Sequence, residues 1–466
     1  NDSVHKVLAK AVCGCSAELI SGEDVFRVMA GVKRLVPTNV GLLDVRNLSR
    51  RFSMHVGADV IEGFPVAQAQ TKTKTNIFAY GYENGERVSI GGSLKGRIWS
   101  YRVAPTIKHW TDWCDHIGAK VSDSEINLDE VMRGFIRPKV VDRRPPYVAL
   151  GLEWPWEVFM SLSEETRVER NGVDWPLIDI DMVITEFLDC GPIMFDVMTP
   201  DWKTRYAIDF EKGQIIYRLD DATEAEVVTR GSRIPLSDYF EKYGLSILFD
   251  QDAMVVPPGV LLKPDRELPP FDPDKLIVLD WSGVNIGKES QGPSCAADSI
   301  QAYVIDYVRG LGKWEIIIDD DGTGEVADIV AMRVDGEYLV VTLVHCKYSS
   351  NYRPGRRVGD LYEVCGQTQK SIRWRRDREK MFATLIRHER DRIRRQRRSG
   401  LIVGDGNALY RLAEHAYILK PDFRVFIAQP GLSKGKASNE QLDLLGSTEV
   451  YLREVADMPL HVLCSE

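Results

Sequence analysis

The sequence contains no pair of cysteines separated by two residues, although it has 8 cysteines among 466 residues. A structural zinc site is therefore not expected, and neither is a disulfide framework at this length. No stretch approaches the roughly 20 apolar residues that a membrane-spanning helix needs, and the first residues lack the basic leader of a signal peptide. We therefore expect a cytoplasmic protein with no membrane partner.

A nucleotide-binding loop is also missing. The segment 283–290 (GVNIGKES) has one residue too few between its glycines for a P-loop, whose backbone must wrap a phosphate group. An ATP-driven motor is therefore not expected within this sequence. The chain begins with Asn1 rather than methionine, which is compatible with an origin in a longer polypeptide.

The net charge of −9 argues against a general nucleic-acid binder, but the charge is unevenly distributed. Residues 352–400 contain 16 Lys and Arg against 6 Asp and Glu. Such a basic segment in an acidic protein is typical of a polyanion contact, although a solvated helix would explain it equally simply. The candidate nucleic-acid-binding residues are Arg356, Arg357, Lys370, Arg373, Arg375, Arg376, Arg394 and Arg395.

The pattern along the chain predicts four regions. Residues 1–145 are expected to be mixed α+β, with a hairpin turning at Asn84-Gly85, and are a possible helicase-associated segment. In this region Trp110 and Trp113 have helical spacing, which favours a core stripe over base stacking. Residues 146–262 alternate apolar and polar positions, with a turn at Lys212-Gly213, and indicate a β-rich binding or docking module.

A proline-rich stretch, 263–275, is the predicted linker. Beyond it, 276–466 alternate between helical and strand patterns, which indicates an α/β layer architecture. Helices are expected near 296–310, 359–374 and 408–419, and strands near 314–319, 326–334, 338–349, 401–405 and 424–429.

Asp335-Gly336, between two apolar runs, predicts a tight hairpin turn. If these two residues form the turn, Asp328 lies opposite Leu343. Because side chains alternate along a strand, Asp328, His345 and Lys347 then share one face and Cys346 points to the other. The three polar groups lie at the end of a very apolar hairpin, where charges need partners or a metal ion.

These residue types suit phosphodiester hydrolysis. A carboxylate can hold a divalent cation that polarises the phosphate, and a lysine can neutralise the charge that develops on it. The segments GTGEVADIV (322–330), LVHCKYS (343–349) and DLYEVCGQTQKS (360–371) resemble the PD-(D/E)xK restriction-endonuclease-like nucleases, and in particular the C-terminal nuclease regions of bacterial defence superfamily-2 helicases.

This resemblance covers roughly residues 290–466. It implies a mixed sheet flanked by helices, with Asp328 as the first acid, Lys347 as the lysine and Gln367 as a supporting glutamine of the next helix. It also implies Mg²⁺ or Mn²⁺ as cofactor, DNA as substrate, and a helicase motor encoded upstream or present as a separate subunit.

One position departs from the pattern, because His345 occupies the place of the usual second acid. Imidazole is a poor ligand for Mg²⁺ and suits Mn²⁺ better. His345 is therefore expected to act as a base or a softer ligand, or else another carboxylate takes part. Glu325 is the nearest, although the predicted pairing puts it on the wrong face unless the glycines before it break the strand; Glu363 is another.

The function predicted from the sequence is a divalent-metal-dependent endonuclease, with a role in antiviral or anti-plasmid defence implied by the resemblance. The alternative is a catalytically inactive nuclease-like module that binds nucleic acid or acts as a scaffold of such a complex.

Overall fold

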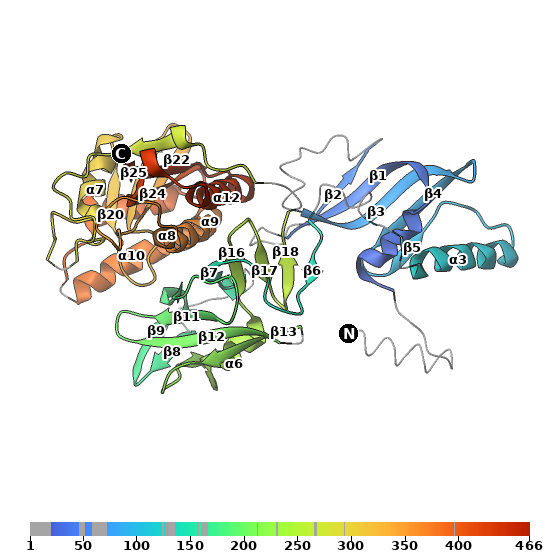
Figure 1. Ribbon diagram of the computed structural model, residues 1–466, viewed down its shortest axis with the longest axis horizontal. Coiled ribbons are helices and arrows are strands. Elements are labelled where there is room, and N and C mark those ends of the chain that lie inside the picture. Colours follow the sequence, from blue (N-terminus) through green and yellow to red (C-terminus); the bar gives the residue numbers. More distant parts are fainter. Residues whose placement is uncertain are drawn as a thin grey trace. The chain divides into compact units, whose positions relative to one another are not determined.

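A computed structural model describes residues 20–45, 52–57, 72–123, 125–126, 128, 136–155, 158–159, 166–211, 213–229, 232–264, 268–292, 294–395 and 397–466. The chain divides into two compact units, Asn1–Pro138 and Lys139–Glu466, drawn in Figure 1. The first unit thus ends before the boundary predicted at residue 145. Among the described residues, no helix combines the length and the apolar character needed to cross a membrane.

Unit 1 contains a five-stranded antiparallel sheet and a helix that covers it. The strand order is β2-β1-β3-β4-β5. The bounds are η1 Gly22–Met29, β1 Lys33–Asp44, β2 Phe52–Val56, β3 Lys72–Glu83, β4 Glu86–Ser93, β5 Arg97–Trp99 and α3 Ile107–Ser122. Glu83 pairs with Glu86, so the hairpin turn predicted at Asn84-Gly85 is confirmed.

The tryptophan stripe of α3 is only partly core. Ile117 and Val121 pack against Phe26 and Val40, whereas the Trp110 side chain is 56% exposed. The expectation that helical spacing places Trp110 in the core is therefore wrong. The apolar side chains of α3 are buried toward its C-terminal end, at Ile117 and Val121, and exposed toward its N-terminal end.

The first half of unit 2 is built from short antiparallel sheets, as its alternating pattern predicts. The sheet orders are β6-β18-β17-β16-β7, β10-β11-β12-β13 and β15-β14-β8-β9. The bounds are β6 Lys139–Val140, β7 Ala149–Glu153, β8 Arg167–Arg170, β9 Val173–Pro176, η2 Leu177–Asp179, β10 Asp181–Ile184, β11 Ile193–Met198, β12 Lys203–Glu211, β13 Gln214–Leu219, β14 Glu226–Thr229, β15 Ser232–Pro235, α6 Leu236–Tyr243, β16 Ser246–Phe249, β17 Met254–Val256 and β18 Val260–Leu262. Strands β12 and β13 pair across Glu211 and Gln214, although Lys212 of the predicted turn lies outside the described residues.

The second half of unit 2 contains a seven-stranded mixed sheet, ordered β19-β25-β24-β22-β21-β20-β23. Strands β20, β21 and β22 form an antiparallel meander, and β24 then runs parallel to β22. The bounds are η3 Pro273–Lys275, β19 Leu276–Val278, α7 Ile300–Gly310, β20 Ile316–Asp319, β21 Ile329–Asp335, β22 Tyr338–Cys346, α8 Gly359–Lys370, α9 Ile372–Arg376, α10 Arg378–Arg394, β23 Leu401–Val403, α11 Gly406–His415, β24 Lys420–Ser433, η4 Lys434–Lys436, α12 Asn439–Ala456 and β25 Leu460–Ser465. The coarse prediction of an α/β fold with a mixed C-terminal sheet is confirmed.

Alternation along the strands assigns each face of this sheet to its own helices. Ile329 and Val344 point to the side covered by α7, whereas Val330 and Leu343 belong to the larger core that contains α8 and α12. A strand buried on both faces reads as a continuous apolar run, which explains the sequence YLVVTLV of β22.

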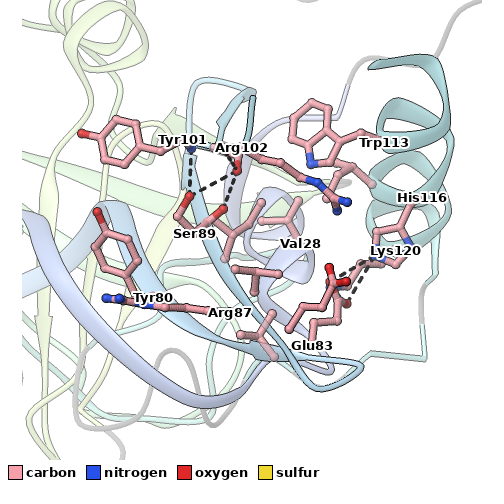
Figure 2. A pocket seen from close by; sticks show the side chains of 16 residues that line it. Val28, Tyr80, Glu83, Arg87, Ser89, Tyr101, Arg102, Trp113, His116 and Lys120 are labelled. Atoms are coloured by element: carbon pink, nitrogen blue, oxygen red, sulfur yellow. Dashed lines mark hydrogen bonds and ion pairs between the residues drawn. The ribbon is translucent and has the colours of Figure 1, made fainter. Parts of the chain in front are cut away.

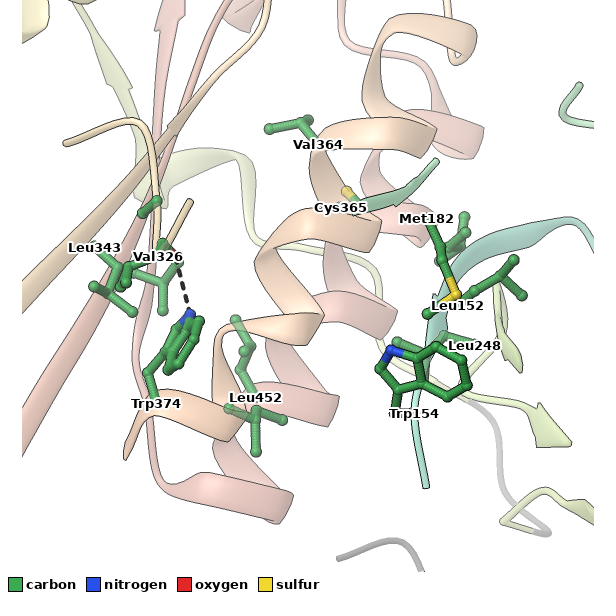
Figure 3. Close-up of a cluster of buried hydrophobic side chains, with 14 of the residues drawn as sticks. Leu152, Trp154, Met182, Leu248, Val326, Leu343, Val364, Cys365, Trp374 and Leu452 are labelled. Atoms are coloured by element: carbon green, nitrogen blue, oxygen red, sulfur yellow. Dashed lines mark hydrogen bonds between the residues drawn. The ribbon is translucent and has the colours of Figure 1, made fainter. Parts of the chain in front are cut away.

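Helix α8 joins the two halves of unit 2, because it packs on β22 and β24 with one side and on β7 with the other. Figure 3 shows Val326, Leu343 and Trp374 at the sheet, and Leu152 and Trp154 on the opposite side of the helices. A methyl group added at Gly366 would lie 1.9 Å from the Leu150 carbonyl oxygen. Glycine is therefore required where α8 meets β7.

The predicted linker does not separate two independent bodies. Residues 265–267 lie outside the described part, but Phe271 is fully buried and its amide donates to the Leu442 carbonyl at 2.9 Å. The β-rich region and the C-terminal sheet share one core that includes Phe271. The prolines restrict this segment, and Phe271 anchors it to α12.

Candidate metal centre

The hairpin β21–β22 turns one residue later than the sequence suggested. Asp335 pairs with Tyr338, so Gly336 and Glu337 occupy the turn, with Gly336 at φ 58°. Ile329 pairs with Val344, and one step further Asp328 faces His345 rather than Leu343. Moving the turn by one residue changes the partner of each strand residue by two positions. Because side chains alternate with a period of two, the residues still point to the predicted faces.

Three potential ligands converge at the end of this hairpin. Ligand atoms of Glu325, Asp328 and His345 all lie within 4.8 Å of one another. Strand β21 begins only at Ile329, so Glu325 belongs to the preceding loop and is free of strand alternation. The expectation that strand pairing would place Glu325 on the opposite face from Asp328 is therefore wrong. The loop that contains Gly322 and Gly324 precedes the strand and allows Glu325 to lie beside Asp328 and His345.

His345 is held with one ring nitrogen satisfied and the other open. Its side chain is 4% exposed, and Nε2 lies 2.7 Å from Ser371 Oγ. Among the described residues the buried Nδ1 has no hydrogen-bond partner, and it lies 3.9 Å from Asp328 Oδ2. Burial, together with the charges of Arg373 and Lys370, lowers the pKa of His345 to about 3. The ring is therefore neutral, and a tautomer with its proton on Nε2 presents the Nδ1 lone pair to the carboxylates.

The two carboxyl groups are held in an environment that disfavours their negative charge. The pKa of Asp328 lies well above its usual range, mainly because the group is buried and secondarily because the negative charges of Glu289 and Asp321 are near. In the same way, burial and then the charges of Asp328 and Asp321 raise the pKa of Glu325. Asp328 Oδ2 still accepts a hydrogen bond from the Cys346 amide at 2.9 Å. Clustered buried carboxylates of this kind are stabilised when a cation binds between them.

Lys347 extends the site with a fixed positive charge. Its Nζ lies 2.9 Å from Glu363 Oε1 and 3.2 Å from Glu289 Oε2. Burial lowers the pKa of Lys347, but the two carboxylates outweigh it and raise the pKa above its usual value. The ammonium therefore stays protonated at neutral pH, so it can stabilise negative charge but cannot act as a base.

Helix α8 contributes to the site with one face. Glu363 and Gln367 are four residues apart, and such residues lie on the same face of a helix. Ser371, at the C-cap of α8, is four residues further and donates through Oγ to the Gln367 carbonyl at 3.5 Å. The side-chain oxygen Oε1 of Gln367 is buried and has no hydrogen-bond partner in the described part of the chain. Glu363 holds the lysine and does not belong to the three-residue ligand cluster.

Most of the predicted nucleic-acid-binding residues contact protein instead of forming an open surface. Lys370 Nζ donates to the Met182 carbonyl and Arg376 to that of Val455, both at 3.0 Å. Arg373 is stacked 4.4 Å from the Trp374 ring centroid. These three are corrections to the sequence prediction: they support the contact between α8, α9 and their neighbours.

The other five predicted contacts differ in their accessibility. Arg357 pairs with Asp360 at 2.8 Å and Arg375 is partly buried, 4.0 Å from Asp457. Arg356, Arg394 and Arg395 are exposed. The basic run therefore divides into an inward-facing part and an exposed part, because the helices α8–α10 present opposite sides to the core and to solvent.

Sequence reasoning did not identify Glu289 and Ser371 as parts of the site. Glu289 lies 58 residues before Lys347 in the chain, in a segment that contains no periodic pattern. Only the helical spacing from Gln367 to Ser371 was a detectable signal. A comparison with protein-family models, with curated proteins and with solved structures found no match for this chain.

Proposed function

We propose that the protein is a divalent-metal-dependent nuclease, with its metal held by Glu325, Asp328 and His345. The observation that carries the proposal is the buried Nδ1 of His345, which has no partner among the described residues, beside two buried carboxyl groups that form no ion pair with a described Lys or Arg. One imidazole and two carboxylates fit a divalent transition metal, and the nitrogen favours Mn²⁺ over Mg²⁺.

Each residue around the proposed ligands has a role that follows from its contacts. Ser371 fixes the orientation of the imidazole through Nε2, as partners of metal-bound histidines do. Bound at this site, a divalent cation supplies the Lewis acidity that phosphodiester hydrolysis needs. Lys347, positioned by Glu289 and Glu363, stabilises the negative charge that develops on the phosphoryl oxygens.

The element order also supports a nuclease of the PD-(D/E)xK type. Helix α7 precedes the meander β20–β21–β22, and α8 precedes the parallel strand β24, which is compatible with the order that the sequence resemblance implies. The acid at the start of β21 and the lysine after β22 occupy the ends of adjacent strands. DNA as the substrate, a helicase partner and a role in defence remain predictions from that resemblance.

The test is a cleavage assay on the full chain with labelled duplex and single-stranded DNA, in Mg²⁺ and in Mn²⁺. Asp328→Asn and Lys347→Met are each expected to lower the rate about 100-fold or more, the size of effect seen when one group that stabilises charge in a transition state is removed. Asp335→Asn, an exposed residue at the end of β21 beside the hairpin turn, is the matched control and should leave the rate unchanged.

Thermal unfolding distinguishes the enzyme from the inactive alternative. Mn²⁺ should raise the melting temperature of the wild type but not that of Asp328→Asn, because a ligand stabilises only the state that binds it. If Mn²⁺ stabilised the protein but no cleavage occurred, the inactive nuclease-like binding module would be favoured. That alternative is suggested by His345, which occupies the place of the usual second acid. Cleavage that persists at the wild-type rate in both Asp328→Asn and Lys347→Met would refute the proposed centre.

A further inference from the structure

Unit 1 contains a cavity of about 430 Å³ between helix α3, strands β3 and β4, and the segment that follows β5, within the range of roughly 300–1,000 Å³ that is usual for ligand pockets. Figure 2 shows its lining, with the rings of Tyr80, Tyr101 and Trp113 and the side chains of Arg87 and Arg102 around it. These residues lie far along the chain from the proposed metal centre, and none of them contributes to it.

The aromatic wall of the cavity is held rigidly by the sheet. Tyr101 lies edge-on against Phe78 with ring centroids 4.7 Å apart, and Trp99 stacks on Phe78 at 6.5 Å. A methyl group at Gly91 would lie 2.5 Å from the Trp99 ring, so glycine is what allows the indole to lie flat on β4. The Tyr101 side chain itself is 71% exposed.

Two serines fix the segment that follows β5 at the cavity. The Tyr101 amide donates to Ser89 Oγ at 2.8 Å, and the Arg102 amide donates to Ser100 Oγ at 3.1 Å. Ser100 Oγ in turn donates to the Ser89 carbonyl at 2.6 Å. The exposed ring of Tyr101 and the side chain of Arg102 are therefore held on a fixed backbone, from which they extend in opposite directions (Figure 2).

Among the charged residues that line the cavity, Arg87 and Arg102 form no ion pair within the described residues. Residues 87–111 contain no Asp or Glu, and their five Lys and Arg side chains are all exposed: Arg87, Lys95, Arg97, Arg102 and Lys108. None of these five forms an ion pair within the part of the chain that the structure describes. Two acids also line the cavity: Glu83 is paired with Lys120 at 2.7 Å and His116 at 3.3 Å, and Glu86 lies at the hairpin end.

We propose that this surface binds single-stranded nucleic acid, with bases stacked on Tyr101 and Trp113 and with phosphates contacted by Arg87 and Arg102. Tyr101 offers an exposed ring and Trp113 a partly buried one, and Arg87 and Arg102 form no ion pair within the described residues. Aromatic rings near such cations hold single strands, because every base offers a flat face and every linkage a negative charge. A duplex hides its bases from such rings. Unit 1 thus captures a strand by contacts that do not involve the metal centre.

The test measures binding by the full chain in EDTA, using fluorescence anisotropy with labelled oligothymidylate and oligouridylate of about 12 nucleotides. The double variant Tyr101→Ala/Arg102→Ala is expected to raise the Kd for both strands about fivefold or more, the loss that corresponds to one stacked base. Arg102→Ala alone should reduce the slope of log K against log salt by about 0.7, since one phosphate contact is lost.

The control is a second exposed Tyr-Arg pair, Tyr410 and Arg411 on α11. Tyr410→Ala/Arg411→Ala should change the Kd less than twofold, and duplex of the same length should bind more weakly than either single strand. Equal losses in the two double variants, duplex binding as tight as strand binding, or no binding by the wild type would each overturn the proposal. Asp328→Asn should bind normally, so that failure of the metal centre and failure of this surface give different results.

Discussion

A buried histidine next to the proposed centre gives the most quantitative prediction. His388, on α10, has Nδ1 2.9 Å from Asp320 Oδ1 and Nε2 3.7 Å from Asp179 Oδ1. Burial lowers the pKa of His388, but the charge of Asp320 and the hydrogen bonds to both carboxylates outweigh it and raise that pKa from 6.5 to about 10. Arg387 is the other cation that pairs with Asp179.

The sign of the effect on stability follows from proton counting. Between pH 7 and 10 the folded protein keeps the His388 proton, whereas an unfolded chain with an ordinary pKa has lost it. The stabilisation is therefore complete below pH 6.5 and disappears as the pH rises through 10, at up to about 1.4 kcal/mol per pH unit. The full interval corresponds to at most about 5 kcal/mol. Because desolvation offsets part of a buried ion pair, we expect about 2–4 kcal/mol.

The measurement compares the urea-unfolding free energy of the wild type with that of His388→Gln from pH 7.0 to 9.5. The wild type should be more stable at pH 7, and the difference should shrink steadily as the pH rises. His415→Gln, an exposed histidine bonded only to the Arg411 carbonyl among the described contacts, is the matched control and should show no trend. A difference between wild type and His388→Gln that stays constant over this range would refute the reasoning, as would an NMR titration of the His388 ring with a midpoint below pH 8.

Three further substitutions test the packing and the ligand set. Gly366→Ala should destabilise the protein by about 1–3 kcal/mol, because the new methyl group would collide with the Leu150 carbonyl. Gly359→Ala, in the same helix, places its methyl group where no described atom lies within 4 Å and should be neutral or slightly stabilising. Urea unfolding measures both free-energy changes. Ser371→Ala should weaken Mn²⁺ binding about 10–100-fold, read from the Mn²⁺ concentration that shifts the melting temperature; an unchanged midpoint would mean that the serine does not orient the ring. His345→Asp should shift the preference of cleavage from Mn²⁺ toward Mg²⁺, because oxygen replaces nitrogen as the ligand; an unaltered Mn²⁺/Mg²⁺ rate ratio would show that His345 is not a ligand.

The buried charges around the centre explain why the basic run is not simply a DNA-binding surface. The charges of Lys370 and Arg373 act on Glu153 and Asp181 as well as on His345. Burial has the largest effect on the pKa of all three groups; the two cations come next for Glu153 and His345, and for Asp181 they come after a hydrogen bond from the Gly324 amide. The positive charge of α8 and α9 therefore compensates buried acids of the β-rich half, whereas the exposed arginines lie toward the two ends of the basic run.

Local patterns in the sequence were sufficient for the features that depend on neighbouring residues. Alternation along β21 and β22 placed Asp328, His345 and Lys347 on one face, and that assignment survived an error in the turn because a two-residue shift preserves the faces of a strand. The hairpin at Asn84-Gly85 and the elements expected between residues 296 and 429 were equally local, since turn chemistry and apolar period are properties of short segments. Helices α10 and α12 and strand β25 were not among the expected elements.

Only the tertiary structure decided the features that join distant segments. Glu325 reaches the other ligands because it lies in the loop before β21. Glu289 contacts Lys347 although 58 residues separate them in the chain. Ser371, at the end of α8, hydrogen-bonds Nε2 of His345. Lys370 and Arg373 face inward because α8 is packed between a sheet and β7, which no charge pattern indicates. Sequence period specifies which way a side chain points, whereas the neighbour that it meets depends on which segments the fold brings against it.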